Sequence, residues 1–108
     1  MGSVPSVESQ PAVDLKNWAI IQLADGIRFF VGEEDGKIGK LRTSTPITSI
    51  DETALTGVTE SGRVYRLVGR PRPNPMEDFA CNVMFDLYGI DRETVAIVEL
   101  NAPSYSLH

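Results

Sequence analysis

Short apolar runs separated by turn residues dominate the chain. Two such runs, Trp18–Leu23 and Ile27–Val31, flank Asp25-Gly26, a strong local signal for a β-hairpin. With a two-residue turn, one face of this hairpin carries Trp18, Ile20, Gln22, Ala24, Ile27, Phe29 and Val31, and the other carries Ala19, Ile21, Leu23, Arg28 and Phe30. Because both faces are mostly apolar, we expect this hairpin to be central and covered on each side.

A second hairpin is predicted over Ala54–Gly69, where segments rich in Val, Thr and Tyr flank Ser61-Gly62. The register of its first arm stays open. A two-residue turn places Val58 beside Tyr65. A three-residue turn with Gly62 in the left-handed region places Gly57 there instead, and Leu55 then lies beside Leu67. A shift of one residue exchanges the two faces of the strand.

Shorter strands are expected at Ile38–Arg42, Ile47–Ile50 and Thr94–Leu100, with turn residues about every 8 to 12 positions. The pattern predicts an α+β fold built on a small antiparallel β-barrel or curled sheet of five to seven strands. It would have about the size of an SH3 or OB domain. We expect residues 16–101 to form this single domain, preceded by a flexible leader (1–15) and followed by a loose tail (102–108).

One amphipathic helix is predicted in the C-terminal half, from Pro75 to about Tyr88. Asn74 suits the N-cap, Pro75 the first helical position, and Gly89 the end of the helix. Apolar residues at three- and four-residue spacing form one stripe, which we expect to pack on the sheet: Met76, Phe79, Ala80, Val83 and Leu87. A charge at Val83 is therefore predicted to loosen or unfold the protein.

Composition sets the compartment and the cysteine chemistry. No apolar run reaches about 18 residues, and the first 14 residues lack the basic start and apolar stretch of a signal peptide. The single cysteine, Cys81, cannot form an intramolecular disulfide. We therefore expect a cytoplasmic protein without a membrane span.

Charge is the strongest indication of a partner class. The net charge is −5, and four arginines without an acid lie between Arg63 and Arg72, so the rest of the chain carries −9. Such a surface suits a basic protein partner or simply solubility. The candidate interaction residues lie in two turns: Glu33, Glu34, Asp35, Asp51 and Glu52. These carboxylates could hold a divalent metal only if the turns converged, and solvated turn charges are the simpler interpretation.

Residues for catalysis or cofactor binding are scarce. The single histidine, His108, ends the sequence, and Cys81 lies among apolar neighbours without a histidine to activate it. Gly32, Gly36 and Gly39 form no phosphate-binding motif, because three acids lie among them and no Ser or Thr follows the final Lys. No catalytic residue, cofactor or metal site is predicted, and a non-enzymatic protein is expected.

A nucleic-acid binder is the competing class. Arg63, Arg66, Arg70 and Arg72 could contact a single strand, with Trp18 or Tyr65 as a stacking surface. Arg63 and Arg66 lie on opposite faces of one strand, however, so they do not form a row. Salt bridges to the acidic remainder and protection of a sheet edge are the alternative role of these arginines.

Some turn and core residues match a known pattern. Trp18 and the Asp-Gly hairpin lead into Thr43-Ser44-Thr45-Pro46-Ile47, and Thr59, Ser61-Gly62 and Tyr65-Arg66-Leu67 follow. Over about residues 18–69 the chain resembles small uncharacterised proteins of bacterial genomes and their phages or mobile elements. The resemblance implies no activity, cofactor or catalytic residue. It favours an accessory or inhibitor protein that binds another protein, in keeping with a basic surface as its target.

Overall fold

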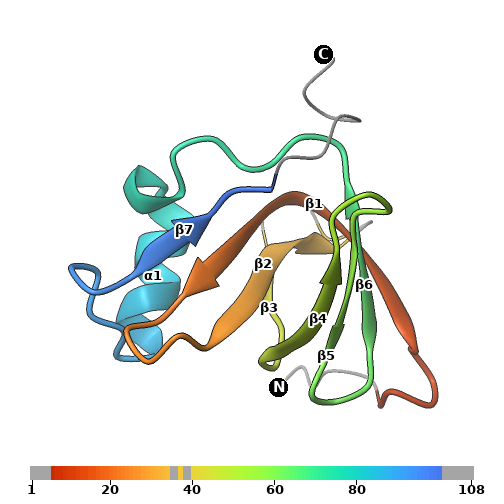
Figure 1. Ribbon diagram of the computed structural model, residues 1–108. Coiled ribbons are helices and arrows are strands. Elements are labelled where there is room, and N and C mark those ends of the chain that lie inside the picture. Colours follow the sequence, from red (N-terminus) through yellow and green to blue (C-terminus); the bar gives the residue numbers. More distant parts are fainter. Residues whose placement is uncertain (1–5, 35–36, 38–39, 101–108) are drawn as a thin grey trace.

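The computed structural model describes residues 6–34, 37 and 40–100. Within them, a seven-stranded mixed sheet packs with a 3₁₀-helix and an α-helix (Figure 1), so the fold is α+β as predicted. The elements are β1 (Ala12–Gln22), β2 (Arg28–Glu34), β3 (Leu41–Thr43), β4 (Ile47–Asp51), β5 (Thr56–Thr59), β6 (Val64–Val68), η1 (Pro75–Glu77), α1 (Phe79–Leu87) and β7 (Ala96–Val98).

The long strand β1 lies at the centre of the sheet. One of its edges pairs with β2 in antiparallel fashion. The other edge pairs first with β6, which runs parallel, and then with β7, which runs antiparallel. The sheet order is β3-β2-β1-β6-β5-β4, and β3 and β4 at its two ends do not pair with each other. The curled, open sheet is therefore mixed, and the expected all-antiparallel pairing was wrong.

The parallel pairing involves residues that the sequence analysis assigned to a leader. Val13 and Leu15 lie in β1 and are buried, with Val13 opposite Tyr65 and Leu15 opposite Leu67 of β6. A bulge follows at Asn17, whose φ of 46° is left-handed. The bulge changes the alternation, so that Trp18 continues the same buried face as Leu15. Polar residues interrupt the short apolar pattern before Trp18, and the sequence analysis therefore did not predict this half of the strand.

The turn at Asp25-Gly26 contains three residues rather than two. Ile21 pairs with Phe29, the Leu23 N–H donates to the Ile27 carbonyl at 2.8 Å, and Gly26 has a φ of 90°. Relative to the expected arrangement, every side chain of β2 changes face. Phe30 therefore packs with Trp18 and Ile20, whereas Phe29 and Val31 pack with Ala19 and Ile21.

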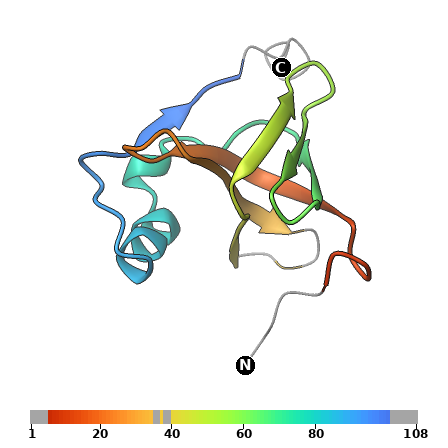
Figure 2. The same cartoon turned by 60° about the horizontal axis from the view of Figure 1, so that its bottom comes forward.

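The β1–β2 hairpin separates two hydrophobic cores (Figure 2). Trp18, Phe30, Tyr65 and their neighbours fill the inside of the curled sheet. On the opposite face, Ile21, Phe29 and Val31 pack against α1. Both predicted apolar faces are thus covered, and the central place of this hairpin is confirmed.

The second hairpin has the register of a three-residue turn. Gly57 pairs with Tyr65, and the Leu67 N–H donates to the Leu55 carbonyl at 2.8 Å. Gly57 faces the inner core, where a Cβ would lie 2.3 Å from Cζ of Phe30. A glycine is needed here because the phenyl ring occupies the side-chain position.

The helical segment differs from the prediction in length and in its buried face. Asn74 makes no side-chain cap, η1 ends at Glu77, and Asp78 is extended and caps a new helix, α1. The buried residues of α1 are Cys81, Met84 and Phe85, while Phe79 and Leu87 are 83% and 78% exposed. The expected docking stripe through Phe79, Val83 and Leu87 was therefore wrong. The break at Asp78 separates Met76 from the rest of that stripe.

The expected last strand is present in a shorter form. β7 pairs with β1 and ties the end of the described chain to the sheet. Of the expected strand Ile38–Arg42, Leu41 and Arg42 belong to β3, whereas Ile38 and Gly39 lie outside the described residues. Within residues 6–34, 37 and 40–100, no helix has the length and apolar character needed to cross a bilayer.

Candidate functional site

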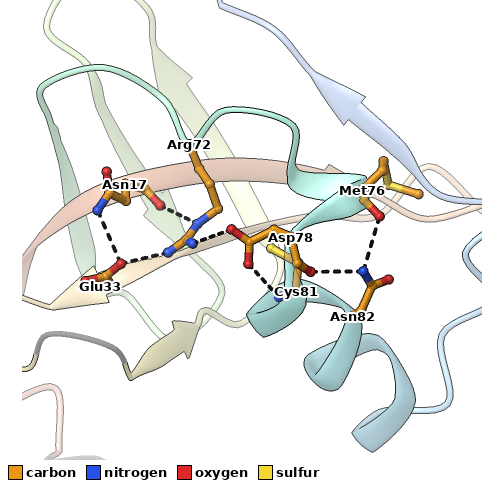
Figure 3. Close-up of polar contacts among 7 residues, drawn as sticks. All are labelled: Asn17, Glu33, Arg72, Met76, Asp78, Cys81 and Asn82. Atoms are coloured by element: carbon orange, nitrogen blue, oxygen red, sulfur yellow. Dashed lines mark hydrogen bonds and ion pairs between the residues drawn. The ribbon is translucent and has the colours of Figure 1, made fainter.

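Arg72 lies at the junction between the sheet and the helix and makes several polar contacts there (Figure 3). Its Nη1 donates to Asp78 at 2.8 Å, its Nη2 to Glu33 at 3.0 Å, and its Nε to the Asn17 carbonyl at 2.9 Å. The Arg72 backbone N–H donates to the Trp18 carbonyl at 2.7 Å. Arg72 therefore joins the β1 bulge, the end of β2 and the start of α1.

The electrostatics of this junction favour its ionised state. Burial raises the pKa of Asp78, but hydrogen bonds from Arg72 and from the Cys81 backbone N–H outweigh it, so the pKa of that carboxyl lies below its ordinary value. The pKa of Arg72 is raised, because its two carboxylate partners outweigh the effect of burial. The three charged groups compensate one another, which is typical of a structural ion network.

Cys81 lies beside this network in the first turn of α1. Its side chain is fully buried, and burial together with the Asp78 carboxylate raises the pKa of its thiol. A protonated, inaccessible thiol is a poor nucleophile. His108, the other residue considered for catalysis, lies outside the described residues.

A second arginine, Arg42 on β3, has a similar structural role. Its Nη1 donates to Glu34 at 2.8 Å and to Gln10 at 3.0 Å, and its guanidinium carbon lies 5.7 Å from the centre of the Tyr65 ring. Gln10 also donates to Glu34 at 2.8 Å. Burial raises the pKa of Glu34, but these hydrogen bonds and the Arg42 charge together lower it.

The candidate acidic residues lie at two separate places. β2 runs opposite to β1 and β4 runs in the same direction as β1, so the turns that follow these two strands lie at opposite ends of the sheet. Glu33 and Glu34 are occupied by Arg72 and Arg42, and Asp51 accepts hydrogen bonds from its own turn. Glu52 is exposed, and Asp35 lies outside the described residues. In the described ranges, no three His, Cys, Asp or Glu side chains group to hold a metal ion.

The residues considered for nucleic-acid contact are mostly internal. Trp18 and Tyr65 are 1% and 2% exposed, and the Trp18 Nε1 donates to the Gly69 carbonyl at 3.1 Å. Arg63 is buried, with its Nε donating to the Gln10 carbonyl at 2.9 Å. Arg66 is exposed and pairs with Asp14, and Arg70 is exposed. Both aromatic residues considered for base stacking, Trp18 and Tyr65, are therefore inaccessible.

The surface that the sequence analysis missed lies on α1. In the part of the chain that the structure describes, six large hydrophobic residues are exposed, and four of them lie together: Phe79 (83%), Val83 (41%), Leu87 (78%) and Tyr88 (64%). Phe79, Val83 and Leu87 are spaced by four residues, so they form one ridge along the helix. We call these four residues the α1 ridge.

A signal for the ridge is present in the sequence. Met84 and Phe85 follow Cys81 by three and four residues. These three residues therefore form a second apolar face on the same helix. A helix with two apolar faces and one sheet to cover it leaves one face without an intramolecular partner. The pattern alone does not say which face that is.

No known protein family, curated protein or solved structure matches this chain. Its chemistry is therefore interpreted from the geometry: two internal arginine networks, a buried thiol, and an exposed apolar ridge.

Proposed function

We propose that this chain is a non-enzymatic interaction module that binds another protein through the α1 ridge. The observation that carries the proposal is the exposure of Phe79 and Leu87, each more than three-quarters accessible on a helix whose opposite face is fully packed. Exposed apolar patches of this kind are typical of protein-binding surfaces.

The acidic character of the chain supports a basic target. The net charge is −5, and the exposed side chains next to the ridge on either side along the chain include Glu77, Asp86 and Asp91. A partner surface that combines apolar and basic residues complements this arrangement in both respects. Occupying such a surface would let the module act as an accessory or inhibitor protein, as expected from the resemblance described above.

The test compares partner capture by three forms of the intact protein. The first is the parent, the second carries Phe79→Ser and Leu87→Ser, and the third is a matched control with Ile27→Ser and Val68→Ser, which are 43% and 38% exposed elsewhere. Thermal melting checks that all three remain folded. We expect a set of co-eluting proteins that the parent and the control retain and the ridge variant loses.

Equal capture by all three folded forms would contradict the proposal, because binding would then not depend on the ridge. If the purified protein converted a substrate and a single substitution abolished that activity, the proposal that the chain is not an enzyme would be contradicted.

A further inference from the structure

We infer that the α1 ridge is occupied by an amphipathic helix of the partner whose polar flanks are basic. This inference rests on the proposed function and specifies the chemistry of the partner segment. It is carried by three observations: the shape of the ridge, the charges around it and its area.

The shape of the ridge suits a helix. Phe79, Val83 and Leu87 follow one row of i, i+4 and i+8 positions, and Tyr88 extends the apolar surface at the C-terminal end of α1. Rows of this spacing pack into the groove between rows of side chains on a second helix. Anchors at this spacing are also how one helix is recognised by another surface.

Along the chain, the charges within the ridge segment and next to its two ends are nearly all negative. Residues 74–93 contain five carboxylates and one arginine, a net charge of −4. Asp78 is paired with Arg72, whereas Glu77, Asp86, Asp91 and Glu93 are exposed. Asp86 lies three residues after Val83 and seven after Phe79, so it borders the ridge directly. Lys or Arg on the flanks of an incoming helix would meet these acids.

The same charges disfavour a second copy of this chain. In a two-fold dimer through the ridge, Asp86 of each copy would approach the acidic flank of the other, and like charges in such an interface repel. The exposed area of the ridge also disfavours a dimer. The four ridge residues expose on the order of 500 Å², below the roughly 800 Å² per partner of a standard stable interface. A single helical segment fits this area.

The test uses three designed helical peptides of about 18 residues with identical leucine faces. Their polar positions are lysine, glutamine or glutamate. Binding to the intact protein is measured by fluorescence anisotropy at about 50 mM and about 500 mM salt. We expect the lysine peptide to bind at least about tenfold more tightly than the glutamate peptide, and this preference to shrink at high salt.

Variants separate the ridge from general attraction between opposite charges. The double variant Phe79→Ser, Leu87→Ser should bind the lysine peptide at least about tenfold more weakly than the parent does. The control variant Ile27→Ser, Val68→Ser should bind it as tightly as the parent. The double variant Glu77→Gln, Asp86→Asn should weaken binding of the lysine peptide by a few fold. Glu8 and Glu60 are exposed elsewhere, so the double variant Glu8→Gln, Glu60→Gln should weaken this binding less.

Equal binding of the three peptides, or unchanged binding by the ridge variant, would overturn the inference. A dimer detected by analytical ultracentrifugation and abolished by the ridge variant would also overturn it, because a second copy would then be the occupant. If the capture of proteins from a lysate depends on the ridge but the lysine peptide does not bind, the inference of a basic helix is wrong and the proposed function stands. If lysate capture does not depend on the ridge, the proposed function itself fails.

Discussion

At the scale of single residues, Arg72 links three parts of the described chain. It follows a glycine and a proline in a segment without regular structure, yet its guanidinium contacts Asn17, Glu33 and Asp78 from three different elements. Asp78 uses its other oxygen to accept from the Cys81 N–H and so begins α1. One ion network thus joins the β1 bulge and the end of β2 to the residue that caps α1.

Acid should weaken this network. The pKa values of Asp78 and Glu34 lie below their ordinary values of 3.8 and 4.5 in the folded protein. A lowered folded-state pKa adds stability that is complete above about pH 5 and is lost as the pH falls through the folded-state values. We expect the free energy of unfolding, measured by urea denaturation, to be constant between pH 6 and pH 7 and to fall below about pH 4.

Asp78→Asn isolates the charge, since asparagine also caps helices. We expect a loss of about 1–3 kcal/mol at pH 7, because Arg72 keeps Glu33 but loses its second carboxylate. The loss should shrink at pH 3, because the Asp78 carboxyl of the unfolded chain is then largely protonated and the ionised form contributes less to the stability of the folded protein. Asp91→Asn is the control, because Asp91 also caps a turn but is exposed. The same loss from Asp78→Asn at both pH values would show that the charge of Asp78 does not matter.

A second residue-scale prediction concerns Gly57. A Cβ there would lie 2.3 Å from the fully buried ring of Phe30, so Gly57→Ala should destabilise the protein by about 1–3 kcal/mol. The expected loss comes from overlap of the new Cβ with the Phe30 ring. The loss of stability should therefore be smaller in a Phe30→Leu background. A double-mutant cycle by chemical denaturation measures this coupling. Additive effects of the two substitutions would rule out the clash.

At the scale of elements, α1 has two apolar faces and one site on the sheet. Cys81, Met84 and Phe85 occupy that site against the outer face of the β1–β2 hairpin. The other apolar face, the α1 ridge, is left exposed. Helix stability and the proposed binding surface therefore depend on different residues of the same nine-residue element.

This separation gives opposite expectations for two neighbouring residues. Val83→Asp should change the free energy of unfolding by less than about 1 kcal/mol, because Val83 is 41% exposed. Phe85→Ala should cost about 3–5 kcal/mol, because Phe85 is fully buried. Urea denaturation at pH 7 measures both. A large loss from Val83→Asp would mean that the helix docks through the ridge after all.

At the scale of the whole molecule, two cores share one hairpin. β1 and β2 contribute alternate residues to the inside of the curled sheet and to the layer beneath α1. Trp18 and Tyr65, the two aromatic residues considered for base stacking, are buried in this packing, and the acidic net charge opposes a polyanion. We therefore predict that the protein does not bind single-stranded nucleic acid through these residues.

We accordingly expect no change in anisotropy when a labelled single-stranded oligonucleotide is titrated with the protein at low salt. A basic OB-fold protein serves as the positive control. Saturable binding weakened by Arg66→Gln and Arg70→Gln, which replace the two exposed arginines of this segment, would contradict this and restore the competing function.

The sequence by itself predicted the α+β class, the positions of both hairpin turns but not their lengths, the double-sided burial of the first hairpin and the existence of one C-terminal-half helix. These features follow from local spacing, since alternation, turn residues and helical periodicity act within a few neighbouring positions. The parallel pairing of β1 with β6, the bulge at Asn17 and the inward face of α1 were decided by tertiary structure. Each depends on residues far apart in the chain: Leu15 against Leu67 across the sheet, and Arg72 holding Asp78 to Glu33. A local pattern shows that a helix has two apolar faces, but only long-range contacts determine which one remains exposed.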